Sequence, residues 1–416
     1  IKMKKILIGV ALLSVCSAYA GDLKAPFSLP SARVLPKGVR NLSYKGLMVT
    51  AENKFNADGT SLVLADPFFK NITFGDAIKG KLDPIDQGSL TQAMLSVGAD
   101  EDTSFGRTTG QVNIKATANV PVFAWGISRK LTLAMAVPVI QSSLNVSTGV
   151  IQENANLHNE MKALLASKGV DSKIAEFDDK MSNPINSKLS DYGYDPLLNE
   201  DKTELGDIKL VAKYSLTDNK KERIVISSDV TLATGTDQDI NKVVQVTSGD
   251  DQYDVGVSLA HDYILTDTLT LSSSAGYTFQ FKDENPERIP MFDDSKVTPD
   301  VDLNTSRDLG DVVIGAVAGK FRHEGWKVET GYTYQYKQSD KYSGEVFSSE
   351  RYNWLEQNTE QEMHTVQLIA GFDTLSLFKK KKFPVPLSLT VNHTQVVKGK
   401  NVVNDPLTSV DFSMFF

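Results

Sequence analysis

Apolar and polar residues alternate along most of the chain with a period of two, which is the period of a β-strand with one apolar and one polar face. In the clearest segment Trp326, Val328 and Tyr332 share one face, whereas Lys327 and Glu329 share the other. Similar segments start near residues 39, 105, 131, 208, 224, 253, 269, 312, 366, 385 and 406. Each of these segments predicts a strand that separates an apolar environment from a polar one.

The order of the segments predicts a closed barrel. Counting them gives about twelve strands, with about fourteen as the alternative, and short turns alternate with long loops. Aromatic residues gather near the strand ends, as the two interfaces of a bilayer favour: Tyr277, Phe279, Phe281, Tyr332, Tyr334 and Tyr336 at one end, and Tyr214, Tyr263, Phe321 and Phe372 at the other. A soluble β-sandwich would not be expected to alternate its connections so regularly. The predicted fold class is all-β, a transmembrane antiparallel up-and-down β-barrel over residues 39–416, with short helices in long extracellular loops.

The last eleven residues, from Pro406 to Phe416, form a strand pattern that ends the chain on an aromatic residue. Phe412, Met414 and Phe416 fall on one face of this strand. A terminal Phe after alternating apolar residues is typical of the C-terminal signal of bacterial outer-membrane barrels. We therefore expect these three residues to be read by the barrel-assembly machinery.

The first twenty residues have the pattern of a secretory signal peptide. Lys4 and Lys5 precede an uncharged apolar run, and Ala18-Tyr19-Ala20 predicts cleavage before Gly21. Cys16 is the single cysteine of the chain, so the mature protein is expected to hold no disulfide. A lipoprotein signal ending at Cys16 is the alternative, and it fits less well. An exported chain without apolar helices predicts the outer membrane of a Gram-negative bacterium, in contact with lipid and lipopolysaccharide.

Residues 21–38 contain three prolines and show no clear period. They predict an extended periplasmic segment or a plug that folds back into the barrel. A flexible leader into the first strand explains the same composition equally well.

Charge and composition exclude two classes of protein. The formal net charge is −8, and it becomes −11 when the three lysines of the signal peptide are removed, which excludes a generally basic nucleic-acid binder. The five histidines are scattered without zinc spacing or a nucleophile motif, so we expect neither an enzyme nor a cofactor: His158, His261, His323, His364 and His393.

Charged residues recur on the polar faces of many predicted strands, where they are expected to point into the lumen: Lys115, Asp207, Lys209, Lys213, Asp229, Asp254, Lys327, Glu329, Lys337 and Asp411. Side chains of both signs predict either a hydrated channel or a network of ion pairs that fills a narrow barrel. A barrel of about twelve strands lies between small filled barrels and wide porins, so its size does not decide. We interpret the wall as that of a narrow conduit.

Apolar residues at helical spacing occur in two of the long loops, including a helical hairpin over residues 154–181. They form a candidate external patch that captures apolar solutes: Phe68, Phe69, Leu90, Met94, Leu164, Leu165, Phe177 and Met181. Packing of the two loops against each other explains the same residues.

An acidic loop holds a weak calcium candidate. Asp300, Asp302 and Asn304 have the spacing of a calcium-binding loop, and Asp308 occupies a later ligand position. The loop lacks the expected glycine and the bidentate glutamate. Solvated surface is the simpler interpretation, so we expect no dedicated metal site.

Two short motifs resemble a known family. Ala32-Arg33-Val34-Leu35-Pro36-Lys37-Gly38 and Leu205-Gly206-Asp207-Ile208-Lys209-Leu210 resemble the outer-membrane family named for the meta-pathway of phenol degradation. That family is distantly similar to the long-chain fatty-acid channels. The chain lacks the Asn-Pro-Ala plug motif of the fatty-acid channels, so no side opening is implied. The resemblance implies passive uptake of small, hydrophobic or aromatic compounds.

Two functional hypotheses follow from the sequence. The first is an outer-membrane channel for passive diffusion of small solutes. The second is a closed structural or adhesive barrel that acts through its extracellular loops. The sequence does not decide the solute, the oligomeric state or whether residues 21–38 occlude the lumen.

Overall fold

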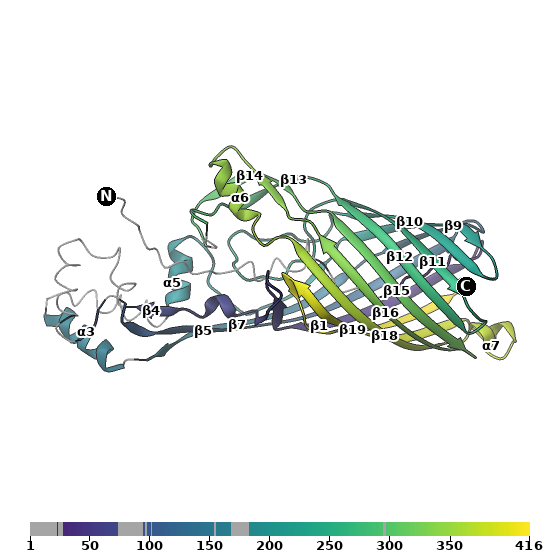
Figure 1. Cartoon of the computed structure of the whole chain (residues 1–416), viewed down its shortest axis with the longest axis horizontal. Helices are drawn as coiled ribbons and strands as arrows, with labels where there is room; N and C mark the ends of the chain where they lie inside the picture. The colour runs from purple at the N-terminus through teal and green to yellow at the C-terminus, as the bar shows by residue number, and fades with distance from the viewer. Residues whose placement is uncertain are drawn as a thin grey trace.

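The structure is a computed structural model of the whole chain (Figure 1). It describes residues 23, 28–73, 95, 98–100, 102–153, 155–167, 183–293 and 297–416. None of the helices in these ranges is long and apolar enough to cross a membrane.

Within the described ranges, twelve strands close into an antiparallel barrel, which confirms the predicted fold class. The ring is formed, in chain order, by β1 (Arg40–Ala51), β5 (Ser104–Gly126), β6 (Leu131–Ala136), β9 (Ile208–Asp218), β10 (Glu222–Leu232), β11 (Asp254–Ile264), β12 (Leu269–Gln280), β15 (Val312–His323), β16 (Trp326–Lys337), β18 (Gln361–Asp373), β19 (Leu387–Lys400) and β21 (Leu407–Phe415). Strand β1 pairs with β21 on one side and with β5 on the other, and this double pairing closes the ring.

The two ends of the barrel differ. One end, the turn end, carries the short turns around residues 127–130, 219–221, 265–268 and 324–325. The opposite end, the loop end, carries the long connections. Strand β5 continues past the barrel at the loop end and pairs there with β7 (Val139–Gln152), so that the two strands project well beyond the ring (Figure 1).

The remaining elements lie outside the ring. The strands among them are β2 (Asn53–Phe55), β3 (Ser61–Val63), β4 (Asn71–Thr73), β8 (Glu200–Leu205), β13 (Asp283–Arg288), β14 (Val301–Asp308), β17 (Lys341–Ser343) and β20 (Val402–Val403). The helices are η1 (Asp66–Phe68), α3 (Ala155–Ser167), α5 (Pro184–Asp191), α6 (Ser349–Leu355) and α7 (Leu375–Lys379). Helix α3 confirms the first half of the predicted helical hairpin, whereas residues 171–181 of its second half lie outside the described residues.

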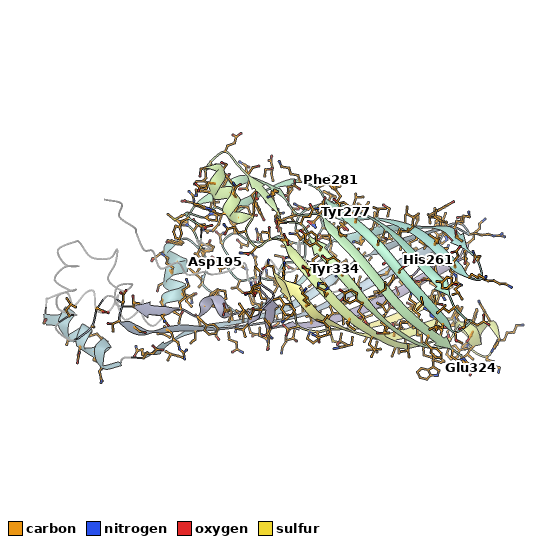
Figure 2. The ribbon with its side chains drawn as sticks, in the orientation of Figure 1. Asp195, His261, Tyr277, Phe281, Glu324 and Tyr334 are labelled. Atoms are coloured by element: carbon orange, nitrogen blue, oxygen red, sulfur yellow. The ribbon has the colours of Figure 1, made fainter. Side chains whose placement is uncertain are left out.

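The outer wall of the barrel is apolar, as the alternation predicts. On β12, for example, Leu271 is 48% exposed, whereas its neighbour Ser272 is 4% exposed and faces inward. Aromatic side chains lie at both ends of the outer wall, and Figure 2 shows Tyr277, Phe281 and Tyr334 at the loop-end side. This arrangement matches the two aromatic belts expected of a membrane-spanning barrel.

On strand β5 the face that was predicted to point into the lumen points outward instead. Val112 and Ile114 are buried inside, whereas Lys115 is exposed on the outer face that also carries Phe123 and Trp125. The prediction that Lys115 lines the lumen is therefore wrong. The reason is that Val112 and Ile114 pack in a buried apolar cluster with Leu64 and Phe68, so the apolar face of β5 points inward here and Lys115, the neighbour of Ile114, points outward.

Residues 28–38 lie inside the lumen. Leu29 packs with Ala318 and Ile369, and the Leu35 N–H donates to Thr132 Oγ1 over 2.8 Å. At the turn end the Gly38 N–H donates to the carbonyl of Gly126 over 2.7 Å, and β1 begins two residues later. The segment thus runs from the middle of the lumen to the turn end before the barrel wall starts.

Candidate functional site

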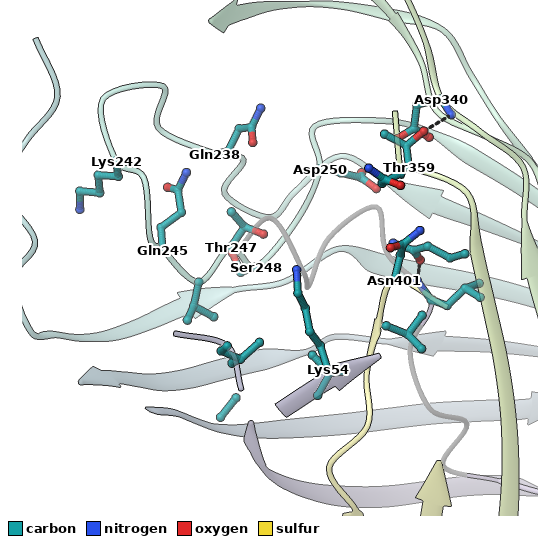
Figure 3. Close-up of a pocket in the computed structure, with 18 of the residues that line it drawn as sticks. Lys54, Gln238, Lys242, Gln245, Thr247, Ser248, Asp250, Asp340, Thr359 and Asn401 are labelled. Atoms are coloured by element: carbon teal, nitrogen blue, oxygen red, sulfur yellow. Dashed lines mark hydrogen bonds between the residues drawn. The ribbon is translucent and has the colours of Figure 1, made fainter. Parts of the chain in front are cut away.

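A cavity of about 1050 Å³ opens inside the barrel at the loop end (Figure 3). We call it the mouth pocket. One wall is apolar and comes from the inner faces of β1, β5 and the β6–β7 junction: Leu47, Val49, Ala116, Ala118, Val120, Ala136, Pro138 and Ile140. Small side chains on β5 leave the space that the pocket occupies. A concave, mostly apolar site with a few convergent polar groups is the usual form of a small-molecule site.

A connection that folds inward, residues 233–253, supplies the opposite side of the pocket. Residues 244–250 are all buried, although they belong to no strand or helix. Val244 and Val246 pack in the same apolar cluster as Ile114 of β5. The apolar side chains of this connection therefore hold it inside the mouth of the barrel.

Asp207 anchors the neck of this connection. Its Oδ1 accepts hydrogen bonds from the N–H groups of Thr234 (3.1 Å) and Gly235 (2.8 Å). Gly235 and Gly249 cross so closely that a Cβ on Gly235 would lie 2.5 Å from the Cα of Gly249. Any side chain at Gly235 or Gly249 would push apart the two ends of the inward connection, so glycine is required at this crossing.

Thr247 supplies an unsatisfied polar group to the pocket. The residue is 4% exposed and lines the cavity, and its Oγ1 has no hydrogen-bond partner among the described residues. Its neighbour Ser248 is satisfied, because its Oγ donates to the Leu205 carbonyl over 2.9 Å. Since buried hydroxyls are nearly always paired, Thr247 marks a place where a bound molecule can form a hydrogen bond.

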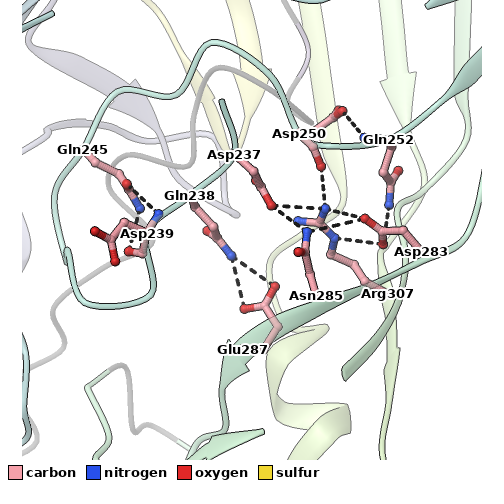
Figure 4. Close-up of polar contacts among 10 residues, drawn as sticks. All are labelled: Asp237, Gln238, Asp239, Gln245, Asp250, Gln252, Asp283, Asn285, Glu287 and Arg307. Carbon is pink, nitrogen blue, oxygen red and sulfur yellow. Dashed lines mark hydrogen bonds and ion pairs between the residues drawn. The ribbon is translucent and has the colours of Figure 1, made fainter. Parts of the chain in front are cut away.

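A buried ion-pair cluster supports the pocket from the loop end (Figure 4). Arg307 on β14 lies 2.6 Å from Asp283 on β13 and 3.5 Å from Asp237 of the inward connection. Burial alone lowers the pKa of the Arg307 guanidinium, but the hydrogen bond to Asp283 and the charges of Asp237 and Asp283 outweigh it and hold that pKa above its ordinary value. Arg307 therefore ties the inward connection to the β13–β14 hairpin as a permanent cation.

Glu287 joins this cluster to the pocket. Its two carboxylate oxygens accept hydrogen bonds from Gln238 Nε2 at 3.0 and 3.2 Å, and both residues line the cavity. Burial raises the pKa of Glu287 to about 7, although the nearby Arg307 opposes the shift. The carboxyl group therefore changes its charge near neutral pH.

Three of the predicted lumen residues line the mouth pocket, namely Asp207, Lys209 and Asp254. Lys209 pairs with a fourth, Asp229, over 2.9 Å. Others lie on the inward face of the ring strands: Lys213, Lys327, Glu329, Lys337 and Asp411. Several of these are paired, Asp411 with Lys45 (3.3 Å), Glu329 with Arg322 (2.8 Å) and Lys337 with Asp340. The structure does not bring the ten residues into one site.

The predicted capture patch divides into residues with different environments. Phe68 is fully buried against Gly110, so for this residue the prediction of an external patch is wrong and packing explains it. Phe69 is exposed. Leu90, Met94, Phe177 and Met181 lie outside the described residues, and the side chains of Leu164 and Leu165 lie outside them as well.

The calcium candidate falls on a strand rather than on a binding loop. Asp302 is buried and accepts a hydrogen bond from the Tyr352 hydroxyl, whereas Asn304 and Asp308 are exposed. The carboxylate of Asp300 pairs with Arg351 over 2.6 Å. Because β14 is extended, it does not wrap these side chains around one ion. In the described part of the chain no group of three or more His, Cys, Asp and Glu is arranged to hold a metal.

The C-terminal aromatic residues lie at the closure of the ring. Phe412 on β21 is opposite Tyr44 on β1, and Met414 is opposite Leu42. Phe412 and Phe416 are exposed on the outer wall. Their role in assembly stays a prediction.

The inward connection and the Arg307 cluster were not predicted from the sequence. Residues 233–253 have two glycines, Gly235 and Gly249, on either side of Val243, Val244 and Val246. These apolar residues, in a connection between two clear strands, were the signal in the sequence that the connection is buried. The Arg307 cluster joins two connections that are distant in the chain, the one between β10 and β11 and the one between β12 and β15, so no local pattern indicated it.

No protein-family model matches the chain, and no curated protein matches it. Among solved structures, the chain is similar to an outer-membrane channel from Pseudomonas putida F1, with a TM-score of 0.53 and 9% sequence identity over 95% of this chain and 100% of that chain. It is also similar to the Ralstonia pickettii toluene transporter TbuX (TM-score 0.34, 9% identity, 95% and 96% covered) and to a Pseudomonas aeruginosa FadL homologue (TM-score 0.33, 9% identity, 96% and 94% covered).

At this level of identity the first of these similarities establishes the fold alone. The chain therefore has the closed barrel fold of an outer-membrane channel, and the resemblance to such channels predicted from the sequence is confirmed at the level of the fold.

Proposed function

We propose that this protein is a channel of the Gram-negative outer membrane that takes up small apolar or aromatic solutes by passive diffusion. The observation that carries the proposal is the mouth pocket, an apolar-walled cavity inside the loop end of a closed barrel. The loop end faces the exterior in this proposal, because long loops are extracellular and short turns periplasmic in such barrels. No catalytic step is assigned to the chain.

The apolar wall gives the pocket its affinity for such solutes. Each methylene group moved from water to an apolar wall contributes about 0.8 kcal/mol. Leu47 and Val49 on β1 and Ala118 on β5 line the cavity, whereas the inward connection contributes the charged residues Asp239, Lys242 and Asp250. An apolar solute is captured at the mouth because it moves there from water to this apolar wall.

Passage beyond the pocket requires a change in residues 28–38. Leu29 and Ala32 occupy the lumen below the pocket, where Ala32 packs with Val225 and Ala260. Lys320 Nζ donates to the carbonyl of Pro30 and holds the segment to β15. We propose that this segment moves when a solute passes, because side-chain contacts and single hydrogen bonds, rather than strand pairing, hold it in place.

The same segment favours the second candidate, a closed barrel that acts through its loops. If residues 28–38 never leave the lumen, the mouth pocket is a binding site without an exit. Solute flux measurements separate the two candidates, because a closed barrel transports nothing.

Liposome swelling tests the proposal. Liposomes that contain the purified protein are expected to swell faster in a small neutral aromatic alcohol than in a sugar of similar size. The double variant L47N/V49N is expected to slow swelling in the aromatic solute several-fold, because two apolar side chains of the wall become polar. V63N is the matched control, since Val63 is exposed on β3 outside the ring. Absence of swelling in both solutes would favour the closed barrel.

A further inference from the structure

We propose that the mouth pocket selects small apolar solutes that carry a protonated amine over those that carry a carboxylate. This inference rests on the proposed uptake function and specifies its substrate class. It follows from the charges that line the pocket, from how each charge is compensated, and from the unsatisfied hydroxyl of Thr247.

Carboxylates outnumber cations in the lining of the pocket. Eight Asp and Glu side chains line it, against four Lys and Arg side chains. Four of the eight carboxylates, Asp239, Asp250, Glu287 and Asp293, belong to the inward connection and to the β13 region, opposite the apolar wall. The pocket therefore has an apolar side and an acidic side.

Two of the four lining cations are paired with carboxylates outside the pocket. Lys209 pairs with Asp229 over 2.9 Å and Lys242 pairs with Glu200 over 2.6 Å, and neither of these carboxylates lines the cavity. The Arg288 guanidinium donates to backbone carbonyls, including that of Gly193 at 2.8 Å. Two of the four cations thus have their countercharge behind the wall.

Two carboxylates of the inward connection accept hydrogen bonds from neutral groups, whereas the lining residue Asp340 pairs with Lys337. Asp239 Oδ1 accepts one from the Asn241 N–H (2.9 Å), and Asp250 Oδ1 accepts one from the Gln252 N–H (3.1 Å). Hydrogen bonds from N–H groups stabilise a carboxylate without cancelling its net charge. An excess of negative charge therefore remains on the acidic side of the pocket and attracts a cation.

Thr247 gives independent evidence that a polar group is bound there. Its hydroxyl is buried and unpaired within the described residues, and it belongs to the same connection as Asp239 and Asp250. An ammonium group has three donors and no acceptor, so it can donate to Thr247 Oγ1 and to a carboxylate at the same time. A carboxylate ligand would bring a like charge to this side of the pocket.

Binding measured with three matched solutes tests the inference. Phenylethylamine, phenylethanol and phenylacetate share one aromatic body and carry a positive, no and a negative charge at neutral pH. The chain has three tryptophans, of which Trp125 and Trp326 are exposed on the outer wall and Trp354 lines the pocket. The variant W125F/W326F in detergent therefore reports binding through the fluorescence of Trp354, and calorimetry on the unmodified protein checks the same affinities.

The expected order of affinity is amine, then alcohol, then carboxylate, with at least about a tenfold difference between the first and the last. Equal affinities, or tighter binding of phenylacetate, would overturn the charge inference while leaving uptake of apolar solutes intact. If phenylethanol does not bind at all, both the inference and the proposed function fail.

Variants locate the effect in the pocket. Measured at about pH 8, where Glu287 is ionised, D239N and E287Q are each expected to weaken amine binding about threefold or more without changing alcohol binding, since each removes one negative charge. T247V is expected to weaken both. D267N is the matched control, because Asp267 lies in the β11–β12 turn at the turn end. Equal loss of amine and alcohol binding in D239N and E287Q would show a structural effect and would contradict the proposal.

Discussion

Leu29 belongs to the lumen segment, residues 28–38, and packs against Gly331 of β16 without room for a side chain at position 331. A Cβ at position 331 would lie 2.4 Å from Leu29 Cδ2 and 2.7 Å from the carbonyl oxygen of Val317. The lumen segment is thus seated on a glycine of the barrel wall. Any larger residue at position 331 must displace the segment, the wall or both.

The variant G331A tests this seat. We expect it to loosen residues 28–38 and to increase liposome swelling in small solutes several-fold, at a cost of about 1–3 kcal/mol from overpacking. G315A is the matched control, because a Cβ at Gly315 of β15 meets nothing within 4 Å. Swelling rates that are the same in G331A and G315A would show that the contact does not restrain the segment.

Glu287 predicts a pH dependence of stability at the loop end. Its pKa is about 7 in the folded protein, above the ordinary value of 4.5 that it takes in the unfolded chain, so the folded state keeps a proton that the unfolded state has released. The contribution of Glu287 to stability is therefore complete below about pH 4.5 and is lost as the pH rises through about 7, by up to about 3 kcal/mol.

The variant E287Q is expected to remove most of this pH dependence. Urea unfolding followed by Trp354 fluorescence in the W125F/W326F background measures it, because α6 contacts β17 in the same loop-end region. The difference between midpoints at about pH 5 and about pH 8 is expected to be smaller in E287Q. If the difference between the two midpoints is the same in E287Q as in the parent, a group other than Glu287 causes the pH dependence.

The variant R307M is expected to destabilise the loop end by about 3–5 kcal/mol, because it leaves Asp237 and Asp283 buried without their countercharge. R307K keeps the charge and is expected to lose less. The barrel itself is expected to keep its heat-modifiable migration on gels. R129A, in the turn between β5 and β6, is the matched control. If R307M unfolds at the same urea concentration as the parent, the cluster does not stabilise the loop end.

The variant F416A is expected to lower the amount of folded barrel in the outer membrane several-fold while total synthesis stays the same. Phe416 and Phe412 are exposed on the outer wall next to β1, and we propose that the assembly machinery reads them. F378A serves as the control, since Phe378 is an exposed aromatic residue of α7. Unchanged levels of folded F416A would rule out its role as a signal.

The strands of the wall were predictable because side chains along each strand alternate between the apolar outer face and the polar inner face. The predicted alternation from Trp326 matches β16, and the aromatic residues lie at the predicted ends. The facing of β5 was not predictable, since both of its faces contain residues that suit a partly apolar interior. Lys115 was assigned inward because the polar face of a membrane strand is expected to line the lumen, whereas on β5 the apolar face with Val112 and Ile114 packs inward.

The site was less predictable than the fold. Asp207, Lys209 and Asp254 were predicted to line the lumen, and the structure places them in the lining of the mouth pocket, where their common position depends on the inward connection. That connection is held by Val244, Val246 and the Gly235–Gly249 crossing, none of which forms a periodic pattern. Contacts between segments distant in the chain leave no local signal in the sequence.

A reversible disulfide between positions 29 and 318 tests most directly the claim that solutes pass along the lumen in which residues 28–38 lie. Leu29 and Ala318 belong to one buried cluster, and the predicted mature chain contains no cysteine, so L29C/A318C introduces a single pair. We expect liposome swelling in a neutral aromatic solute to be slow when the disulfide is formed and to return to the rate of the unmodified protein after reduction. Equal swelling in the oxidised and reduced states would contradict passage of solutes along this lumen.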